Sequence, residues 1–409
     1  MSKAGFWKRD WLLGLVLAVG LLFLAGSDLI QSLERKAYDM GVRATDRTPS
    51  DRIAVIAIDE ASLRNIGRWP WSRDVHARLT ETLTAGRAKV VGNLVFFTEP
   101  QIDPGLAYIR KLDGEYRKLL ADPAAAAEPG SPLAQMGALL QEAEGALDTD
   151  RKLAASYAKA GNVLLPMLFS LGEARGKPDR PLPDFVTRNA LANVQGDGAE
   201  TPFTTAADVV FPVDALGRAT AGVGHLNARV DVDGGIRSEP LVLAHFDQLY
   251  PSLSMLIAAR SLNLGPGDIK VALGEGVSLA NLRITTDPRL QMYTYFYKDR
   301  DGRPAFPVDS FFDVYSGKIP ADRYKDKIVL VGPTAPGLGT ASVTPVSPAM
   351  APVLTLAHSV SSILQEHFFV VPTWAVWAEF GVYLLVALYL IAALPRLKAG
   401  MGAAVTALL

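Results

Sequence analysis

The strongest constraint on this chain is a pair of long apolar runs, one near each end, each with basic residues on one side. The first covers residues 11–30 and follows Lys3, Lys8 and Arg9. About 20 apolar residues are enough for a helix to cross a bilayer. A secretory signal peptide shares the basic start, but its apolar core is shorter and ends at a small-x-small cleavage site, which this run lacks. We therefore expect a first membrane span at residues 11–30.

The second run covers residues 373–394 and carries interface markers at both ends. Two tryptophans stand at its start, where indole rings favour the membrane surface, and Arg396 and Lys398 follow its end. We expect a second span here. Glu379 lies about one and a half turns into the run. An acid at that depth is either paired within the membrane or able to reach the outer surface beside a tryptophan.

The basic flanks then orient the chain. Cytoplasmic flanks of membrane spans carry an excess of Lys and Arg, so residues 1–10 and the basic end of the second run are expected in the cytoplasm. Residues 34–371 are then extracytoplasmic, and the lipid bilayer is a partner of the chain. Residues 399–409 are apolar but too short to cross a membrane, and we interpret them as the start of a third span.

The composition excludes several classes of function. Lys and Arg total 41 and Asp and Glu total 42, which gives no support for a nucleic-acid partner, because such a partner needs a clustered basic surface. The chain has no cysteine, which excludes disulfides, cysteine-based zinc sites and thiol catalysis. Its 409 residues are enough for one large domain or two medium ones.

Four short apolar runs predict strands that are buried on both faces, as in a parallel sheet. They cover residues 52–59, 89–97, 162–170 and 326–332. Between the first two, Ser72 is a candidate N-cap for a helix whose apolar residues recur every four positions at Val75, Leu79 and Leu83. Strands alternating with helices indicate an α/β layered fold.

An antiparallel portion is expected in addition. The segment "DVDGG" at residues 231–235 is a hairpin signal, and residues 277–285 and 291–298 are further strand candidates. Because residues 326–332 return to the buried-strand pattern, we predict a single mixed α/β exterior domain with a largely parallel central sheet.

Other segments have simpler interpretations. Residues 121–132 and 172–202 are rich in small and polar residues and are expected to be surface excursions, whereas residues 135–161 favour a helix. Residues 34–42 can continue the first helix beyond the membrane, and the amphipathic residues 352–369 precede the second span. Two helices leading into two spans form a mechanical link between the exterior domain and the bilayer.

The stretch "IAVIAIDEASLRNIGRWPWSRD", residues 53–74, holds most of the candidate site residues. Two interpretations compete: a rigid aromatic plug over the end of the sheet, or the lip of a binding site where parallel strands end. We favour the plug for the two tryptophans and ligand contact for the acid that ends the strand and the second arginine of the turn. The candidates are Asp59, Glu60, Arg68, Trp69, Trp71, Arg73 and Glu99.

Motifs for catalysis or metal binding are absent from the sequence. The "DVDGG" segment lacks the later ligands of a calcium loop, and the histidines show no metal spacing, with His76 expected on the surface of its helix. There is no HExxH, no G-x-S-x-G and no phosphate loop, since residues 332–341 are Gly-rich but lack its lysine. We expect no catalytic residue, no metal and no cofactor.

Several stretches together resemble the type-2 CHASE domain, an extracytoplasmic sensory module of bacterial receptors. They are "IAVIAIDEASLRNIGRWPWSRDVHARL", "KVVGNLVFFTEP", "GHLNARVDVDGGIRSEPL", "YPSLSM", "FFDVYSGKIPADRYKDKIVLVGPTAPGL" and "TPVSP", in the order of the family. The resemblance covers roughly residues 38–369. It implies a multi-pass receptor of the bacterial cytoplasmic membrane that senses an unknown small molecule or environmental signal. It also implies a homodimer or higher oligomer with a cytoplasmic kinase or nucleotide cyclase, of which this sequence contains no motif.

The chain departs from the family pattern near its last exterior helix. Relatives have a glutamate and a histidine where "APVLTLAH" places Leu354 and Leu356, with His358 at an asparagine position. This departure implies a different ligand, or none, at that helix. Two further functions remain open: a membrane assembly module that needs no ligand, and an extracytoplasmic enzyme anchored in the membrane.

Overall fold

The computed structural model describes residues 3–24, 27–121, 130–173, 176, 181–196, 204–300, 302–372 and 374–408. The chain divides into two compact units, and each is described by itself. One consists of Met1–Thr45 with Val370–Leu409, and the other is Asp46–Phe369.

The first unit is helical. It contains α1 (Lys3–Leu24), α2 (Asp28–Ala44), α13 (Ala375–Leu388), which continues through η4 (Tyr389–Ala393) and η5 (Leu394–Arg396), and α14 (Ala399–Leu408). Gly14 allows α1 to approach η4 closely, because a Cβ there would lie 2.3 Å from the Leu390 carbonyl oxygen. The Tyr383 hydroxyl also donates a hydrogen bond to the Ala18 carbonyl oxygen at 3.1 Å.

One helix among the described residues is long and apolar enough to cross a membrane, and it runs from Ala375 to Arg396. The apolar part of α1, Trp11–Phe23, is shorter than such a helix. The structure therefore contains one candidate span at the second predicted position, and the first predicted span stays a prediction. Residues 34–42 are helical, as predicted, but they belong to α2, a separate helix that begins after the extended Ser27 and does not continue α1.

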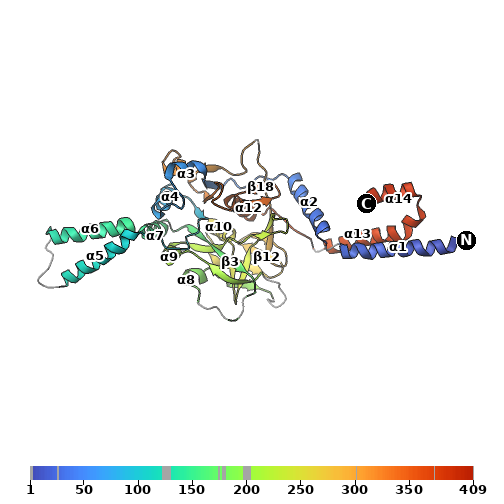
Figure 1. The fold of residues 1–409 in the computed structure, drawn as a ribbon, viewed down its shortest axis with the longest axis horizontal. Coiled ribbons are helices and arrows are strands. Elements are labelled where there is room, and N and C mark those ends of the chain that lie inside the picture. The colour runs from blue at the N-terminus through green and yellow to red at the C-terminus, as the bar shows by residue number, and fades with distance from the viewer. Residues whose placement is uncertain are drawn as a thin grey trace. The chain divides into compact units, whose positions relative to one another are not determined.

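The second unit, which we call the sheet domain, is built on a seven-stranded sheet with the order β15-β1-β16-β2-β3-β5, in which β6 also pairs with β3 (Figure 1). All pairs are parallel except β3 with β5. The strands are β1 (Ile53–Ile58), β2 (Val90–Asn93), β3 (Val163–Leu171), β5 (Ala206–Val210), β6 (Gly222–His225), β15 (Val308–Ser310) and β16 (Ile328–Pro333). The predicted parallel sheet is confirmed, although β2 ends four residues before the predicted limit.

Both faces of this sheet are covered. Alternate residues of β1 enter two different hydrophobic clusters, with Ile53 and Val55 in one and Ile56 and Ile58 in the other. On one face lie α4 (Arg73–Ala85), α7 (Thr149–Ala160) and α9 (Asp214–Ala219), and on the other lie α10 (Leu253–Ser261) and α12 (Pro352–Gln365). The apolar runs read from the sequence follow from this double burial.

Smaller, mainly antiparallel sheets complete the sheet domain. One sheet contains β7 (Arg229–Val230), β8 (Ile236–Pro240), β14 (Gln291–Thr294) and β19 (Phe368–Phe369). A second contains β4 (Asn193–Gln195), β11 (Ile269–Ala272), β12 (Gly276–Leu279) and β13 (Leu282–Thr285). Two further sheets are the pairs β9 (Val242–His245) with β10 (Gln248–Pro251) and β17 (Ser342–Thr344) with β18 (Ser347–Met350). Within these smaller sheets, only β4 and β11 form a parallel pair among the described strands. The predicted "DVDGG" hairpin joins β7 to β8. Arg237 forms ion pairs with Asp231 at 2.8 Å and with Asp233 at 2.9 Å, so the carboxylates of this turn are paired with an arginine side chain.

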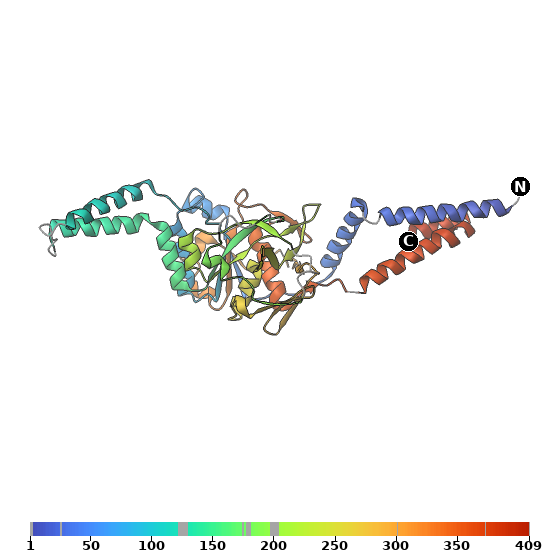
Figure 2. The same ribbon diagram turned by 90° about the horizontal axis from the view of Figure 1, so that it is seen from below.

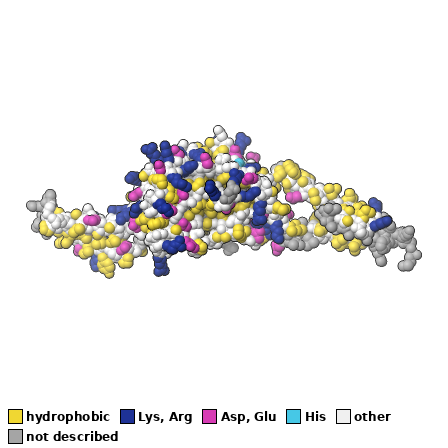
Figure 3. All heavy atoms as spheres, turned by 90° about the horizontal axis from the view of Figure 1, so that it is seen from above, with side chains coloured by type: hydrophobic (Ala, Val, Ile, Leu, Met, Phe, Trp, Pro, Cys, Tyr) yellow, Lys and Arg dark blue, Asp and Glu magenta, His cyan; other side chains and the backbone are white. Residues whose placement is uncertain are grey.

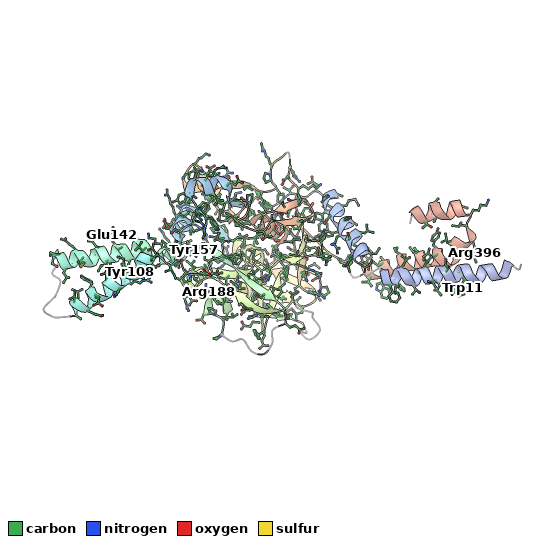
Figure 4. The ribbon with its side chains drawn as sticks, in the orientation of Figure 1. Trp11, Tyr108, Glu142, Tyr157, Arg188 and Arg396 are labelled. Carbon is green, nitrogen blue, oxygen red and sulfur yellow. The ribbon has the colours of Figure 1, made fainter. Side chains whose placement is uncertain are left out.

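A helical hairpin of α5 (Pro104–Leu120) and α6 (Pro132–Leu147) extends from the sheet domain (Figure 2). Sequence analysis missed α5 and merged α6 with α7. The two helices separate at Asp148, whose carboxylate accepts a hydrogen bond from the Arg151 amide at 3.1 Å and caps α7. Tyr108 on α5 and Glu142 on α6 mark the hairpin in Figure 4. Most of the first predicted surface excursion, residues 121–132, lies outside the described residues. The second, residues 172–202, is partly wrong, because residues 181–196 contain α8 (Asp184–Thr187) and β4 and bury Phe185 and Val186 in the core.

The face drawn in Figure 3 shows acidic and basic side chains interspersed over the sheet domain. By contrast, the hairpin exposes an apolar stripe on α5 at Tyr108, Leu112 and Leu119, which lie within about 40° of one another around the helix.

The last helix of the sheet domain differs from its prediction in two ways. It ends at Gln365, where Glu366 takes a left-handed conformation with φ of 52°, and β19 follows, so the helix does not extend to residue 369. It is also more buried than an amphipathic helix on a surface, because its residues 356–363 are all buried. The sheet, α10 and β14 cover this part of the helix, whereas Thr355 and Gln365 remain partly or fully exposed.

Close packing of α10 on the sheet gives a first prediction. A Cβ at Gly224 of β6 would lie 2.8 Å from the Leu253 Cα, which is backbone and cannot move aside easily. We expect Gly224→Ala to lower the free energy of unfolding by about 1–3 kcal/mol, the usual cost of overpacking a core. Urea unfolding checks this. Gly267→Ala is the control, because nothing lies within 4 Å of a Cβ there, and equal stability of both variants contradicts the prediction.

Candidate functional site

A cavity of about 480 Å³ lies where the parallel strands end, and we call it the strand-end cavity. Residues 94–96 follow β2, residues 226–228 follow β6, and Pro333 ends β16. Ligands of open α/β sheets bind at this edge, and the volume suits a small molecule. The sequence analysis placed a possible binding lip at the same edge.

The remaining walls come from four other parts of the sheet domain. They are the tryptophan turn with α4 (Trp69, Pro70, Trp71, Arg73, His76), the β8 and β14 strands (Ile236, Ser238, Glu239, Thr294), the segment after β16 (Leu338, Gly339, Thr340, Ser342) and α12 (Pro352, Thr355, Leu356, Ser359). Most of this lining is apolar, and its uncharged polar groups are mainly hydroxyls.

The two tryptophans have different roles. Trp71 is 4% exposed, its indole nitrogen donates to the Gly67 carbonyl oxygen at 2.9 Å, and its ring packs 4.8 Å from that of Phe311. Trp69 is only partly buried and meets Trp71 edge-on at 5.1 Å. Trp71 is therefore the predicted plug, whereas Trp69 presents its ring at the margin of the cavity.

Arg73 lines the cavity but is held by other groups. Its Nε lies 3.1 Å from an Asp150 carboxylate oxygen, and its Nη2 donates to the Glu99 carbonyl oxygen at 3.0 Å. Its guanidinium carbon stands 4.5 Å from the centre of the Phe97 ring. The charge of Arg73 is thus compensated within the protein, and the carboxylate of Asp150 also accepts the Gln101 amide at 2.8 Å.

The other predicted site residues lie outside the cavity lining. Asp59 caps α3 (Glu60–Ile66), because its Oδ1 accepts hydrogen bonds from the Ser62 amide, the Ser62 hydroxyl and the Ser310 hydroxyl at 2.8, 2.6 and 3.0 Å. Glu60 is exposed and pairs with Arg64 at 3.7 Å. Arg68 and the Glu99 side chain are also exposed. The structure thus brings three of the seven candidates together at the cavity: Trp69, Trp71 and Arg73.

Sequence analysis missed the acid of the cavity, Glu239 on β8. Its Oε1 accepts a hydrogen bond from the Ser254 hydroxyl at 2.6 Å, while its Oε2 is buried without a hydrogen-bond partner among the described residues. Burial raises the pKa of this carboxyl, and nearby serine hydroxyls oppose the rise. The preceding residues Arg237 and Ser238 are also polar, so no local pattern distinguishes this acid from a surface residue.

The prediction that His76 lies on the surface is wrong. Its side chain is 2% exposed and its ring packs against those of Trp69, Phe97 and Phe311 at 5.9, 5.2 and 5.9 Å. Burial, with help from the charge of Arg73, lowers the pKa of His76 to about 3, so the imidazole is neutral at pH 7.

No metal centre accompanies the cavity in the part of the chain that the structure describes, since no three His, Asp or Glu residues there are grouped to hold an ion. An apolar cavity with one unsatisfied carboxyl oxygen has the character of a small-molecule binding site.

A doubly covered, largely parallel sheet with a ligand-sized cavity at its strand ends defines an α/β binding domain. Its sequence leads directly into a candidate membrane helix. The family model of the CHASE2 domain matches residues 14–394, so the chain belongs to the CHASE2 domain family, a family of extracellular sensory domains. The comparison with curated proteins found no match, nor did the comparison with solved structures.

Buried histidines of the sheet domain predict a loss of stability in acid. Burial lowers the pKa of His225 to about 3, and neither ring nitrogen has a hydrogen-bond partner among the described residues. Between pH 6.5 and about 3 the unfolded chain binds a proton that the folded state excludes, so the free energy of unfolding falls as pH falls. Each such histidine contributes a slope of about 1.4 kcal/mol per pH unit.

His225→Leu removes this proton without removing a hydrogen bond. We expect urea unfolding of the variant between pH 4.5 and 6.5 to show a shallower dependence on pH than the parent protein. His367→Gln is a second test in the same direction, because burial, with the charge of Arg47, also lowers the pKa of His367. Identical slopes for His225→Leu and the parent contradict the prediction.

Proposed function

We propose that the sheet domain is the extracytoplasmic sensor of a transmembrane receptor, and that a small molecule in the strand-end cavity is its signal. The signal passes through membrane helices to a cytoplasmic output module, a kinase or a nucleotide cyclase, in the cytoplasmic membrane of a bacterium. Membership of the CHASE2 family supports the sensor role. The cavity is the observation that carries the proposal, because a sensor must hold its ligand.

The position of α12 supports the relay. Thr355, Leu356 and Ser359 of this helix line the cavity, and the chain beyond it continues through β19 to the candidate membrane helix at Ala375. A ligand that contacts α12 therefore acts on the last helix before the span. It changes the output only if it binds two states of the domain with different affinity.

Hydrogen bonds connect α12 to the first residues of the sheet domain as well. The Ser50 amide donates to the Ser361 hydroxyl at 2.9 Å, and that hydroxyl donates to the Tyr297 hydroxyl at 3.0 Å. The Tyr297 hydroxyl in turn lies 3.1 Å from His367 Nδ1. The segments near both ends of the domain thus share one chain of hydrogen bonds with α12, and displacement of α12 affects both.

The orientation of the sheet domain can be tested by cysteine labelling, because the natural chain has no cysteine. Leu112→Cys places one thiol on the exposed stripe of α5, and Lys8→Cys places one before the first apolar run. In intact cells a membrane-impermeant maleimide should label the Leu112 variant and spare the Lys8 variant until the cells are permeabilised. The opposite pattern contradicts an extracytoplasmic sensor.

The cavity itself can be tested by filling it. A compound collection is screened by thermal shift on the full chain in lipid nanodiscs, and a compound at a hundred times its Kd stabilises the folded form by about 2.7 kcal/mol. Thr355→Trp, which places an indole in the cavity, should abolish these shifts. Gln365→Trp is the control, since Gln365 is exposed at the end of α12. Hits that persist in the Thr355→Trp protein do not bind in this cavity and contradict the proposal.

A further inference from the structure

The ionisable groups of the strand-end cavity differ in how far their hydrogen-bonding and charge requirements are met. Among the described residues that line it, Arg73, His76 and Glu239 carry such groups. Arg73 is paired with Asp150, bonded to the Glu99 carbonyl oxygen and placed over Phe97. His76 is buried among aromatic rings and neutral. Glu239 is the acid of the three, and its Oε2 lacks a hydrogen-bond partner among the described residues.

Hydroxyls of Ser252, Ser254 and Ser359 surround Glu239, and among the described residues no counter-charge accompanies them. Ser254 donates to Oε1 at 2.6 Å and is itself 2.8 Å from the Ser252 hydroxyl, while no cation contributes to the electrostatics of the carboxyl. The Oε2 atom is buried and has no hydrogen-bond partner among the described residues. Burial raises the pKa of this carboxyl, and an ammonium group beside Oε2 favours its ionised form. An ionised carboxylate only accepts hydrogen bonds, so the cation that completes it donates.

The rest of the cavity suits an apolar body. Leu94, Phe96, Leu226 and Ile236 contribute aliphatic and aromatic surface. The partly buried ring of Trp69 adds the side chain whose face attracts cations most strongly. A volume of about 480 Å³ exceeds what a single ion or water needs.

We propose that the strand-end cavity binds an amphiphilic organic amine, whose ammonium group donates to Oε2 of Glu239 and whose apolar part lies against the aliphatic and aromatic walls. This inference rests on the proposed function and names the class of signal. An anionic ligand fits less well, because the cation of the cavity is already paired and its open group is an acid. A metal ion lacks the cluster of ligands that it needs among the described residues.

Three probes of similar size and different charge test the proposal: 2-phenylethylamine, 2-phenylethanol and 3-phenylpropionate. Each is titrated at pH 7 into the full chain in lipid nanodiscs, and binding is followed by calorimetry and by thermal shift. We expect the amine to bind at least tenfold more tightly than the alcohol and the acid to bind most weakly. Partition of the amine into lipid is the same for every variant and is subtracted with empty nanodiscs.

Variants at Glu239 assign the preference to its carboxylate. Glu239→Gln keeps the size of the side chain and an acceptor for Ser254, and we expect it to weaken the amine at least tenfold and the alcohol less than threefold. Glu239→Asp keeps the charge with a shorter reach and should retain a preference for the amine, so it tests the proposal even where the glutamine variant folds poorly. Glu60→Gln is the matched control, because Glu60 is an exposed acid outside the cavity lining.

The outcomes separate this inference from the proposed function. Equal binding of amine and alcohol, or a preference for the amine that survives Glu239→Gln, overturns the amine proposal while the cavity remains a sensor site. Binding of other screened compounds, blocked by Thr355→Trp, with no binding of the amine has the same meaning. If neither the three probes nor any screened compound binds in the cavity, both the sensor proposal and the amine proposal are overturned.

Discussion

Burial of the central strands on both faces is the constraint from which the rest of the structure follows. Each of β1, β16 and β2 places alternate side chains into two separate cores, so helices must cover both sides of the sheet. Glycines at positions 92 and 224 bring α10 close, since a Cβ at either would lie under 3 Å from an atom of that helix. With both faces closed, a ligand can reach the sheet at the ends of its strands, and the cavity lies there.

The aromatic turn after α3 is both a plug and a lip, because its two tryptophans line the cavity with different burial. Trp71 is buried and packs against Phe311, whereas Trp69 is only partly buried. Residues that do not touch the cavity hold this turn in place. Asp59 fixes the start of α3 before the turn, and Asp150 on α7 holds Arg73 after it. Two of the predicted candidates, Asp59 and Arg73, therefore help to position this turn. A charged residue in the sequence can position a turn or contact a ligand, and its type alone does not tell which.

The sequence predicts those parts of the fold in which one local pattern has one physical cause. Continuous apolar runs require burial on both faces, and "DVDGG" requires a tight turn, so the sheet and the hairpin could be predicted. The break between α6 and α7 was also readable, because Asp148 in "DTD" can cap a helix. His76 and Glu239 could not be placed, since their burial depends on partners distant in sequence: Phe97 and Phe311 for the histidine, Ser254 for the acid.

The cavity and the proposed relay share one helix, α12. Thr355 and Ser359 are four residues apart and share the face that lines the cavity, while Ser361 lies about 200° further around the helix from Ser359 and bonds the Ser50 amide. The position of α12 therefore depends on the cavity on one face and on the segment around Ser50 on the other. Loss of the hydrogen bonds on either face would leave buried hydroxyls unsatisfied. A buried acceptor without a partner costs about 1–3 kcal/mol, and Glu239 carries such a cost beside this helix. Because Thr355 and Ser359 of α12 line the same cavity, a ligand that satisfies Glu239 lies beside this helix, and it shifts the domain between two states only to the extent that it binds them with different affinity.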